Sequence, residues 1–258
     1  MGAGFTSITA YDKSLFTAQT GNGDVVEHDI YSRGSGAPVV LIQELPGIGK
    51  QTLRLADKLV DAGFEVVMPH LFGPLGKISF AGNFARVFCM RKELDLFAKN
   101  KSSPVVDWLK ALCQHVRETR GVNGVGVIGM CLTGNFAISL IGDDSVLAAV
   151  ASQPASPLFG SRAALHMTPE EVASVRDRLD EIGPMLAYRF EKDPLVPQSK
   201  FTCIHEAFNQ DGKERVKLNT LPGKGHSVLA LDFVDEEGHP TRAALEEIIG
   251  YFRSRLAA

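Results

Sequence analysis

One stretch of the sequence decides the fold: Val127-Ile128-Gly129-Met130-Cys131-Leu132-Thr133-Gly134. An apolar, strand-like run over 125–130 passes within one residue into a segment with helical spacing over 132–141. A strand, a small-x-nucleophile-x-small turn and a helix in this order form a nucleophile elbow. Small residues are needed because bulk at position 129 or 133 would collide with neighbouring backbone in the strained turn. The helix N-terminus favours a thiolate, so we predict that Cys131 is a nucleophile. The alternative is a buried cysteine that only fills space.

Strands and helices alternate on both sides of this elbow. We expect further strands over 38–45, 64–68, 147–151, 185–190 and 216–221, and further helices over 50–62, 84–98, 103–119, from Thr168 onward (with a capping box to Glu171), 198–209 and 241–256. Strands separated by helices and short connections predict a parallel sheet with right-handed crossovers. The fold class is therefore α/β, a mostly parallel twisted sheet with helices on both faces.

Length and composition favour one folded domain. The chain has 258 residues, of which 45% are hydrophobic and 22% are charged, which excludes disorder and fibrous classes. Since α/β architectures often reach this size as one unit, we predict a single domain over 1–258. Two irregular excursions, at about 72–101 and 157–183, are expected near the site.

Charge and cysteine spacing argue against several classes of partner. The net charge is −3 and no run of like charges exceeds three residues, so we expect no nucleic-acid binding. No apolar stretch approaches the ~18 residues that span a bilayer. The four cysteines match no zinc or disulfide pattern, and the G-x-G-x-x-G over 124–129 lies inside a strand, where it cannot cradle a phosphate. We therefore predict a cytoplasmic protein without metal or cofactor, as a monomer or small homo-oligomer.

A thiol nucleophile needs a base and a carboxylate that orients the base. Asp193 follows the expected strand 185–190, and His226 follows the expected strand 216–221. The carboxyl ends of strands are where open α/β sheets carry their sites. The order Cys, Asp, His is that of α/β-hydrolases, so we predict the α/β-hydrolase fold. His226 as an ordinary loop histidine remains the alternative, and Asp180 and Glu181 are rival acids.

The loop after the first buried strand contributes the second oxyanion donor in this fold. Its sequence predicts the backbone N–H groups of Leu45 and Leu132 as the donor pair. Glu44 closes the apolar run just before Leu45. It either faces the thiol or is an exposed charge at the strand end.

From about Pro38 to the C-terminal helix, the chain resembles the dienelactone hydrolase family. The resemblance is carried by Gly129-Met130-Cys131-Leu132-Thr133-Gly134, by Gln43-Glu44, by Asp193 within Glu191–Pro197 and by Gly225-His226-Ser227. Thr133 stands where the family usually has glycine. The resemblance implies that Cys131, Asp193 and His226 form the triad and that Glu44 contacts the resting thiol until substrate displaces it.

The sequence departs from the family in the residues that bind substrate. The family has an arginine shortly after the catalytic histidine that helps to clamp a substrate carboxylate, but none follows His226 before Arg242. Arg86 or Arg91 could supply the other arm of the clamp, or both could be solvated helix charges. Phe72 and other phenylalanines could line an apolar pocket or pack in the core. We therefore expect a less anionic ester or lactone as the small-molecule substrate.

The leading hypothesis is a cofactor-independent hydrolase of carboxylic esters or lactones that forms a thioester on Cys131. An activated phosphotriester is an alternative electrophile for the same thiol. Two hypotheses belong to other functional classes. The protein could be a non-catalytic binding module that keeps the triad as a relic, in which case Cys131 would show no enhanced reactivity. Cys131 could also be a redox-sensing thiol, but the sequence has no nearby resolving cysteine.

Overall fold

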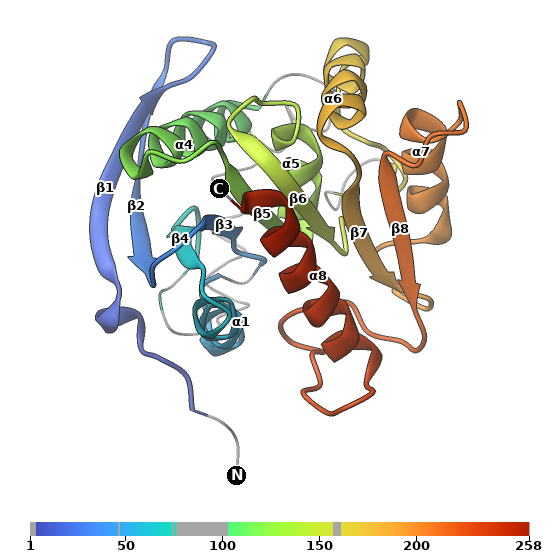
Figure 1. Cartoon of the computed structure of the whole chain (residues 1–258). Coiled ribbons are helices and arrows are strands. Elements are labelled where there is room, and N and C mark those ends of the chain that lie inside the picture. Colours follow the sequence, from blue (N-terminus) through green and yellow to red (C-terminus); the bar gives the residue numbers. More distant parts are fainter. Residues whose placement is uncertain (1–3, 46, 74, 76–102, 157–160, 258) are drawn as a thin grey trace.

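The structure is a computed structural model that describes residues 4–45, 47–73, 75, 103–156 and 161–257. Its strands are β1 (Asp12–Gln19), β2 (Val25–Arg33), β3 (Pro38–Ile42), β4 (Glu65–Pro69), β5 (Val125–Met130), β6 (Val146–Ser152), β7 (Met185–Phe190) and β8 (Val216–Leu221). They form one sheet in the order β1-β2-β4-β3-β5-β6-β7-β8 (Figure 1). The pairs β1–β2 and β2–β4 are antiparallel, and every other neighbouring pair is parallel.

Helices cover both faces of this sheet (Figure 1). They are α1 (Lys50–Asp61), α4 (Pro104–Arg120), α5 (Leu132–Leu140), α6 (Pro169–Ile182), α7 (Gln198–Phe208) and α8 (Pro240–Leu256), with a short 3-10 turn η1 (Ile8–Ala10). Apolar residues of α1 and α8 pack on one face, and those of α4, α5, α6 and α7 pack on the other. The predicted mostly parallel α/β sheet is confirmed.

Several observed elements agree with the sequence pattern. The strands predicted over 125–130, 185–190 and 216–221 have the predicted bounds, and the capping box between Thr168 and Glu171 is present. The strand predicted over 38–45 ends at Ile42. The antiparallel strands β1 and β2 were not predicted from the sequence, and the helix predicted over 84–98 lies outside the described residues.

The carboxyl ends of the strands bring chemical groups to one edge of the sheet. Glu44 follows β3, Cys131 follows β5, Gln153 follows β6, Asp193 follows β7 and His226 follows β8. Residues in β3, β5 and β6 are almost fully buried, because both faces carry helices. The sheet is thus a rigid support for the loops at this edge. Among the described residues, no helix is long and apolar enough to cross a membrane.

Candidate active site

Cys131 lies alone between β5 and α5, at the N-cap position of the helix. Its backbone has φ 58° and ψ −126°, a conformation that non-glycine residues rarely adopt. The N–H of Cys131 donates to the Ser152 carbonyl (3.1 Å), and its own carbonyl accepts from Gly134 (3.0 Å) and Ala155 (3.1 Å). These bonds hold the strained turn between β6 and α5, as expected for a nucleophile elbow.

Gly129 and Thr133 make the turn possible. A Cβ on Gly129 would lie 2.1 Å from the Thr133 carbonyl oxygen, so only glycine fits there. Thr133 lies at the position where the nucleophile elbow usually has a glycine. Its hydroxyl accepts a hydrogen bond from the Met130 N–H (2.9 Å) and donates one to the Gln43 carbonyl (3.2 Å). This hydroxyl therefore ties the elbow to the end of β3.

Two backbone N–H groups border the elbow. Leu132 is the first residue of α5, so its N–H has no acceptor within the helix. Leu45 lies in the turn that the Gly47 N–H closes on the Glu44 carbonyl (2.8 Å), and this bond does not involve the Leu45 N–H. The positions suit the predicted oxyanion donors, which remain a prediction.

The structure brings Asp193 and His226 together. The Nδ1 atom of His226 lies 2.9 Å from Oδ2 and 3.0 Å from Oδ1 of Asp193. The Asp193 side chain is fully buried, and its Oδ1 also accepts from the N–H groups of Leu195 (2.8 Å) and Val196 (3.0 Å). These bonds fix the carboxylate and select the imidazole tautomer that carries the proton on Nδ1.

The other ring nitrogen of His226 is left for Cys131. Nε2 is buried and has no partner of ordinary hydrogen-bond geometry in the described structure. Burial lowers the pKa of His226, but the hydrogen bond to Asp193 and the nearby Cys131 side chain outweigh burial and raise this pKa to about 10. The Cys131 side chain therefore lies close enough to the ring to favour a protonated imidazole.

Asp232 fixes the loop that carries the histidine. Its Oδ2 accepts from the N–H groups of His226 (2.8 Å) and Ser227 (2.9 Å). Gly225 permits this tight loop, because a Cβ there would lie 3.0 Å from the Phe190 ring and 3.1 Å from the Asp232 carboxyl.

Glu44 is buried beside the loop that carries His226, which runs from residue 222 to residue 239 between β8 and α8 and is called the histidine loop below. It accepts from the Ser227 hydroxyl at 2.8 Å (Oε1) and 2.9 Å (Oε2), and from Gln153 Nε2 at 3.2 Å. Burial raises the pKa of Glu44 to about 7, against the lowering effects of these hydrogen bonds and of His226. Glu44 is therefore not an exposed charge at a strand end. Its hydrogen bonds in the described structure go to Ser227 and Gln153, and the contact with the thiol remains a prediction.

The sequence did not reveal Gln153 as a site residue. It follows β6, is fully buried and has φ 37°. The signal available was its position, since it ends a buried strand at the edge that carries the other chemical groups. Neither its backbone conformation nor its partners can be read from a glutamine between Ser152 and Pro154.

The residues predicted to bind substrate are only partly described. Arg86 and Arg91 lie outside the described residues. Phe72 is 4% exposed within the larger hydrophobic cluster, which suits core packing, so its contact with substrate stays a prediction. Cys131 belongs instead to a small hydrophobic cluster with Leu132, Ala155 and Val196. Two exposed leucines, Leu195 and Leu231, lie beside the acid and in the histidine loop.

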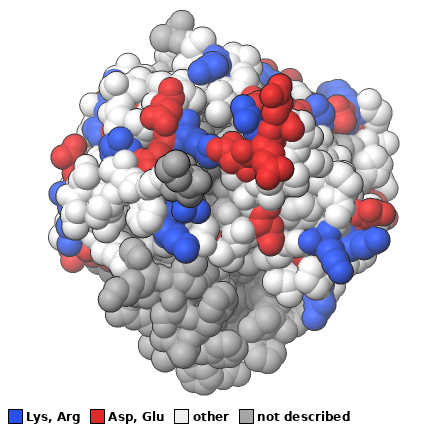
Figure 2. Space-filling model, turned by 90° about the horizontal axis from the view of Figure 1, so that it is seen from below, with Lys and Arg blue, Asp and Glu red and all other residues white. Residues whose placement is uncertain are grey.

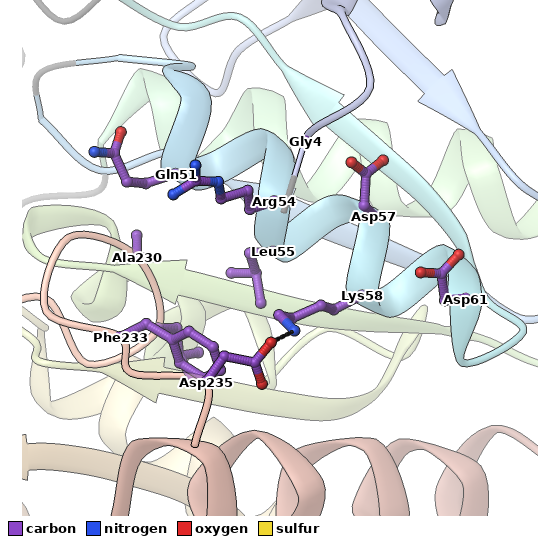
Figure 3. Close-up of a pocket in the computed structure, with 11 residues that line it drawn as sticks. Gly4, Gln51, Arg54, Leu55, Asp57, Lys58, Asp61, Ala230, Phe233 and Asp235 are labelled. Atoms are coloured by element: carbon purple, nitrogen blue, oxygen red, sulfur yellow. Dashed lines mark hydrogen bonds and ion pairs between the residues drawn. The ribbon is translucent and has the colours of Figure 1, made fainter. Parts of the chain in front are cut away.

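A cavity lies between α1 and the histidine loop. It has a volume of about 260 Å³ and is bordered by α1 and by residues 229–235 (Figure 3). Its floor includes Leu55, Ala230 and Phe233, and the Lys58–Asp235 ion pair (2.5 Å) crosses its rim. Seen from below, the described surface carries acidic and basic side chains side by side (Figure 2). Among the described residues, no three His, Cys, Asp or Glu side chains cluster as a metal site would require.

Comparisons with known proteins agree on one family. Residues 30–255 match the model of the dienelactone hydrolase family. A curated relative, carboxymethylenebutenolidase from Rhodococcus opacus, is 24% identical over 221 residues, which are 85% of this chain and 80% of that protein.

Solved structures share the fold. A cold-adapted esterase from an Arctic intertidal metagenomic library superposes with a TM-score of 0.60 at 17% identity, covering 99% of this chain and 98% of its own. A dienelactone hydrolase-like promiscuous phosphotriesterase from metagenomic libraries gives a TM-score of 0.62 at 15% identity, covering 95% of this chain and 99% of its own.

Proposed function

The chain belongs to the dienelactone hydrolase family and is a hydrolase acting on ester bonds, and on this premise we propose that Cys131, His226 and Asp193 perform the hydrolysis through a thioester. The observation that carries the proposal is the orientation of His226. Asp193 holds Nδ1, and Nε2 is the buried ring nitrogen that is left for the nearby Cys131 side chain.

In the first half of the reaction, His226 Nε2 takes the thiol proton and the thiolate attacks the substrate carbonyl carbon. The carbonyl oxygen becomes an oxyanion, which the N–H groups of Leu45 and Leu132 stabilise. Each such donor contributes roughly 3–4 kcal/mol. The oxyanion collapses, the C–O bond to the leaving group breaks, and the imidazolium returns its proton to the departing oxygen. The acyl group then stays on Cys131 as a thioester.

In the second half, water replaces the alcohol. His226 accepts a proton from the water, and the hydroxide attacks the thioester carbonyl within the same oxyanion site. Collapse breaks the C–S bond, the thiolate recovers the proton through His226, and the carboxylic acid leaves. No cofactor enters this sequence of steps.

For the substrate, we propose a neutral ester or lactone rather than an anionic one. Residues 228–230, which follow the histidine by one residue, are buried Val, Leu and Ala, and Leu132, Ala155 and Val196 form an apolar cluster with Cys131. The curated relative is a carboxymethylenebutenolidase, which supports a lactone as one member of this class.

The test measures hydrolysis of aryl acetate, aryl butyrate and an aryl hemisuccinate by the wild type, Cys131→Ala and Cys203→Ala. Cys203 is a partly exposed free cysteine on α7 and serves as the matched control. We expect Cys131→Ala to lose at least about 10³-fold in kcat and Cys203→Ala to be unchanged, with the neutral esters hydrolysed faster than the hemisuccinate. Intact mass after quenching should show the acyl group on wild type only. Undiminished turnover by Cys131→Ala would remove the thioester mechanism.

A phosphotriester belongs in the same substrate panel, since one protein of this fold is described as a promiscuous phosphotriesterase. If kcat/KM for an activated phosphotriester exceeds that for every carboxylic ester, the proposed substrate class changes to phosphotriesters, and Cys131 stays the proposed nucleophile.

A further inference from the structure

Gln153 joins two loops of the site through one side chain. Its Nε2 donates to Glu44 Oε2 (3.2 Å) in the loop after β3. Its Oε1 accepts from the Val228 N–H (3.2 Å) in the histidine loop and from the neighbouring Ser152 hydroxyl. We propose that Gln153 is a positioning residue. It fixes the position of the histidine loop relative to the loop after β3, which contains Glu44 and the proposed oxyanion donor Leu45. This inference rests on the proposed function.

The chemistry of the partners determines how the Gln153 amide is oriented. The Val228 N–H is a donor without alternative, so the atom facing it is the amide oxygen. The Glu44 carboxyl then receives the amide NH2. A glutamate at position 153 would place a second carboxyl 3.2 Å from Glu44, and a shorter side chain would not reach both loops. Glutamine is thus suited to this place by both length and polarity.

The backbone of Gln153 supports the same inference. Its φ of 37° is a conformation that favours glycine, and the residue is fully buried at the end of β6. The Gln153 N–H donates to the Tyr188 carbonyl (2.7 Å) in β7, which anchors the residue to the sheet. A non-glycine residue held in this conformation at a site is consistent with a use for its side chain.

The two loops held by Gln153 carry the groups that must act together. Val228 is two residues from His226, and Glu44 directly precedes Leu45. A hydrogen bond from each loop to one amide therefore fixes the base relative to an oxyanion donor. Ser227 reinforces the link, since its hydroxyl donates to Glu44 and accepts from the Leu231 N–H (2.8 Å).

Packing fixes part of this loop, because Val228, Leu229 and Ala230 are buried in a core cluster. Ala230, Phe233 and Asp235 also border the cavity of about 260 Å³ (Figure 3). Hydrogen bonds to Asp232, from Ser227 to Glu44 and from Val228 to Gln153 add direction to this packing and orient the segment that carries His226. Of these, Gln153 belongs to neither loop and connects both to the sheet.

The test compares Gln153→Met and Gln153→Gly with the wild type. Methionine keeps the length of the side chain but cannot form its hydrogen bonds. Glycine removes the side chain and adopts φ 37° without strain. The glycine variant therefore still tests the proposal if the methionine variant does not fold. Gln114→Met is the matched control, because Gln114 also donates to a carboxylate (Asp143 Oδ2, 2.9 Å) but lies in α4. Aryl-ester turnover, thermal unfolding and the concentration of folded enzyme are measured for each.

We expect kcat per folded molecule to fall about 10–100-fold in both Gln153 variants, with KM changed less than about threefold, because misplaced reacting groups slow the chemical step. Gln114→Met should keep the wild-type kcat. Wild-type kcat in a folded Gln153 variant, or a loss that only follows the unfolded fraction, would overturn the inference. Cys131→Ala in the same assay separates the two proposals: if it is inactive while both Gln153 variants are fully active, only the role of Gln153 is wrong.

Discussion

The Nδ1 atom of His226 lies 2.9 Å from Asp193 Oδ2, and the Asp193 side chain is fully buried. This pair links the loops after β7 and β8, which are 33 residues apart in the sequence. It fixes the imidazole ring so that Nε2 is the atom left for the thiol.

Asp193→Asn should lower kcat about 10²–10⁴-fold while the fold is retained. The asparagine can keep its oxygen on the Leu195 and Val196 N–H groups, but the amide NH2 then selects the wrong imidazole tautomer. Ester turnover measures the effect, and circular dichroism checks the fold. Asp180→Asn removes a partly exposed carboxylate that pairs with the buried Arg215 (2.7 Å), and it should leave kcat per folded molecule unchanged. Equal losses in the two variants would show that Asp193 has no special role.

Gly129→Ala should destabilise the protein by more than about 3 kcal/mol, because its Cβ would meet backbone rather than a movable side chain. The Thr133 carbonyl oxygen would lie 2.1 Å away. Gly250→Ala in α8 is the matched control, since a Cβ there meets nothing within 4 Å. It should stabilise by about 0.5–1 kcal/mol. Urea unfolding of both variants measures the difference, and a Gly129→Ala protein of wild-type stability would contradict the elbow geometry.

Glu44→Gln should change how stability depends on pH. The pKa of Glu44 is raised from 4.5 to about 7 in the folded state, mainly by burial. The carboxyl therefore contributes stability that is fully present below about pH 4.5 and is lost as the pH rises through about 7. Glutamine does not titrate, so the variant should gain about 1–3 kcal/mol relative to wild type between pH 5 and pH 9. Parallel urea titrations at several pH values measure this, and a constant difference would mean that Glu44 does not titrate in this range.

Much of the sheet could be predicted from the sequence because its central strands are buried on both faces. β5 and β7 are fully buried, largely apolar runs that end in turns, and their bounds follow from that pattern. β8 is only partly buried and includes Lys217 and Asn219, and its alternating Val216, Leu218 and Thr220 indicate the strand. β1 has mostly exposed residues and no such pattern. It forms an antiparallel hairpin with β2, and its exposed residues give no buried pattern that would indicate this pairing.

The end of β3 is a second place where the local sequence pattern does not predict the observed structure. The apolar run continues to Leu45, but the strand ends at Ile42 because the turn closed by Gly47 takes over. Residues 43 and 44 are buried by the site rather than by the sheet.

The candidate triad could be proposed from the sequence because each of its residues follows a strand. The role of Gln153 was not, because it depends on two side-chain hydrogen bonds to loops 109 and 75 residues away. Its positive φ is likewise a result of those contacts and of its place in the sheet, and no residue type in the segment indicates it.

All of the proposed chemistry lies at one edge of the sheet, and this has a practical consequence for handling the enzyme. The opposite edge consists of connections such as Val122–Gly124 between α4 and β5, where Asn123 is exposed. A linker attached there would let the protein be immobilised on a bead or electrode with its reactive side turned to the solution.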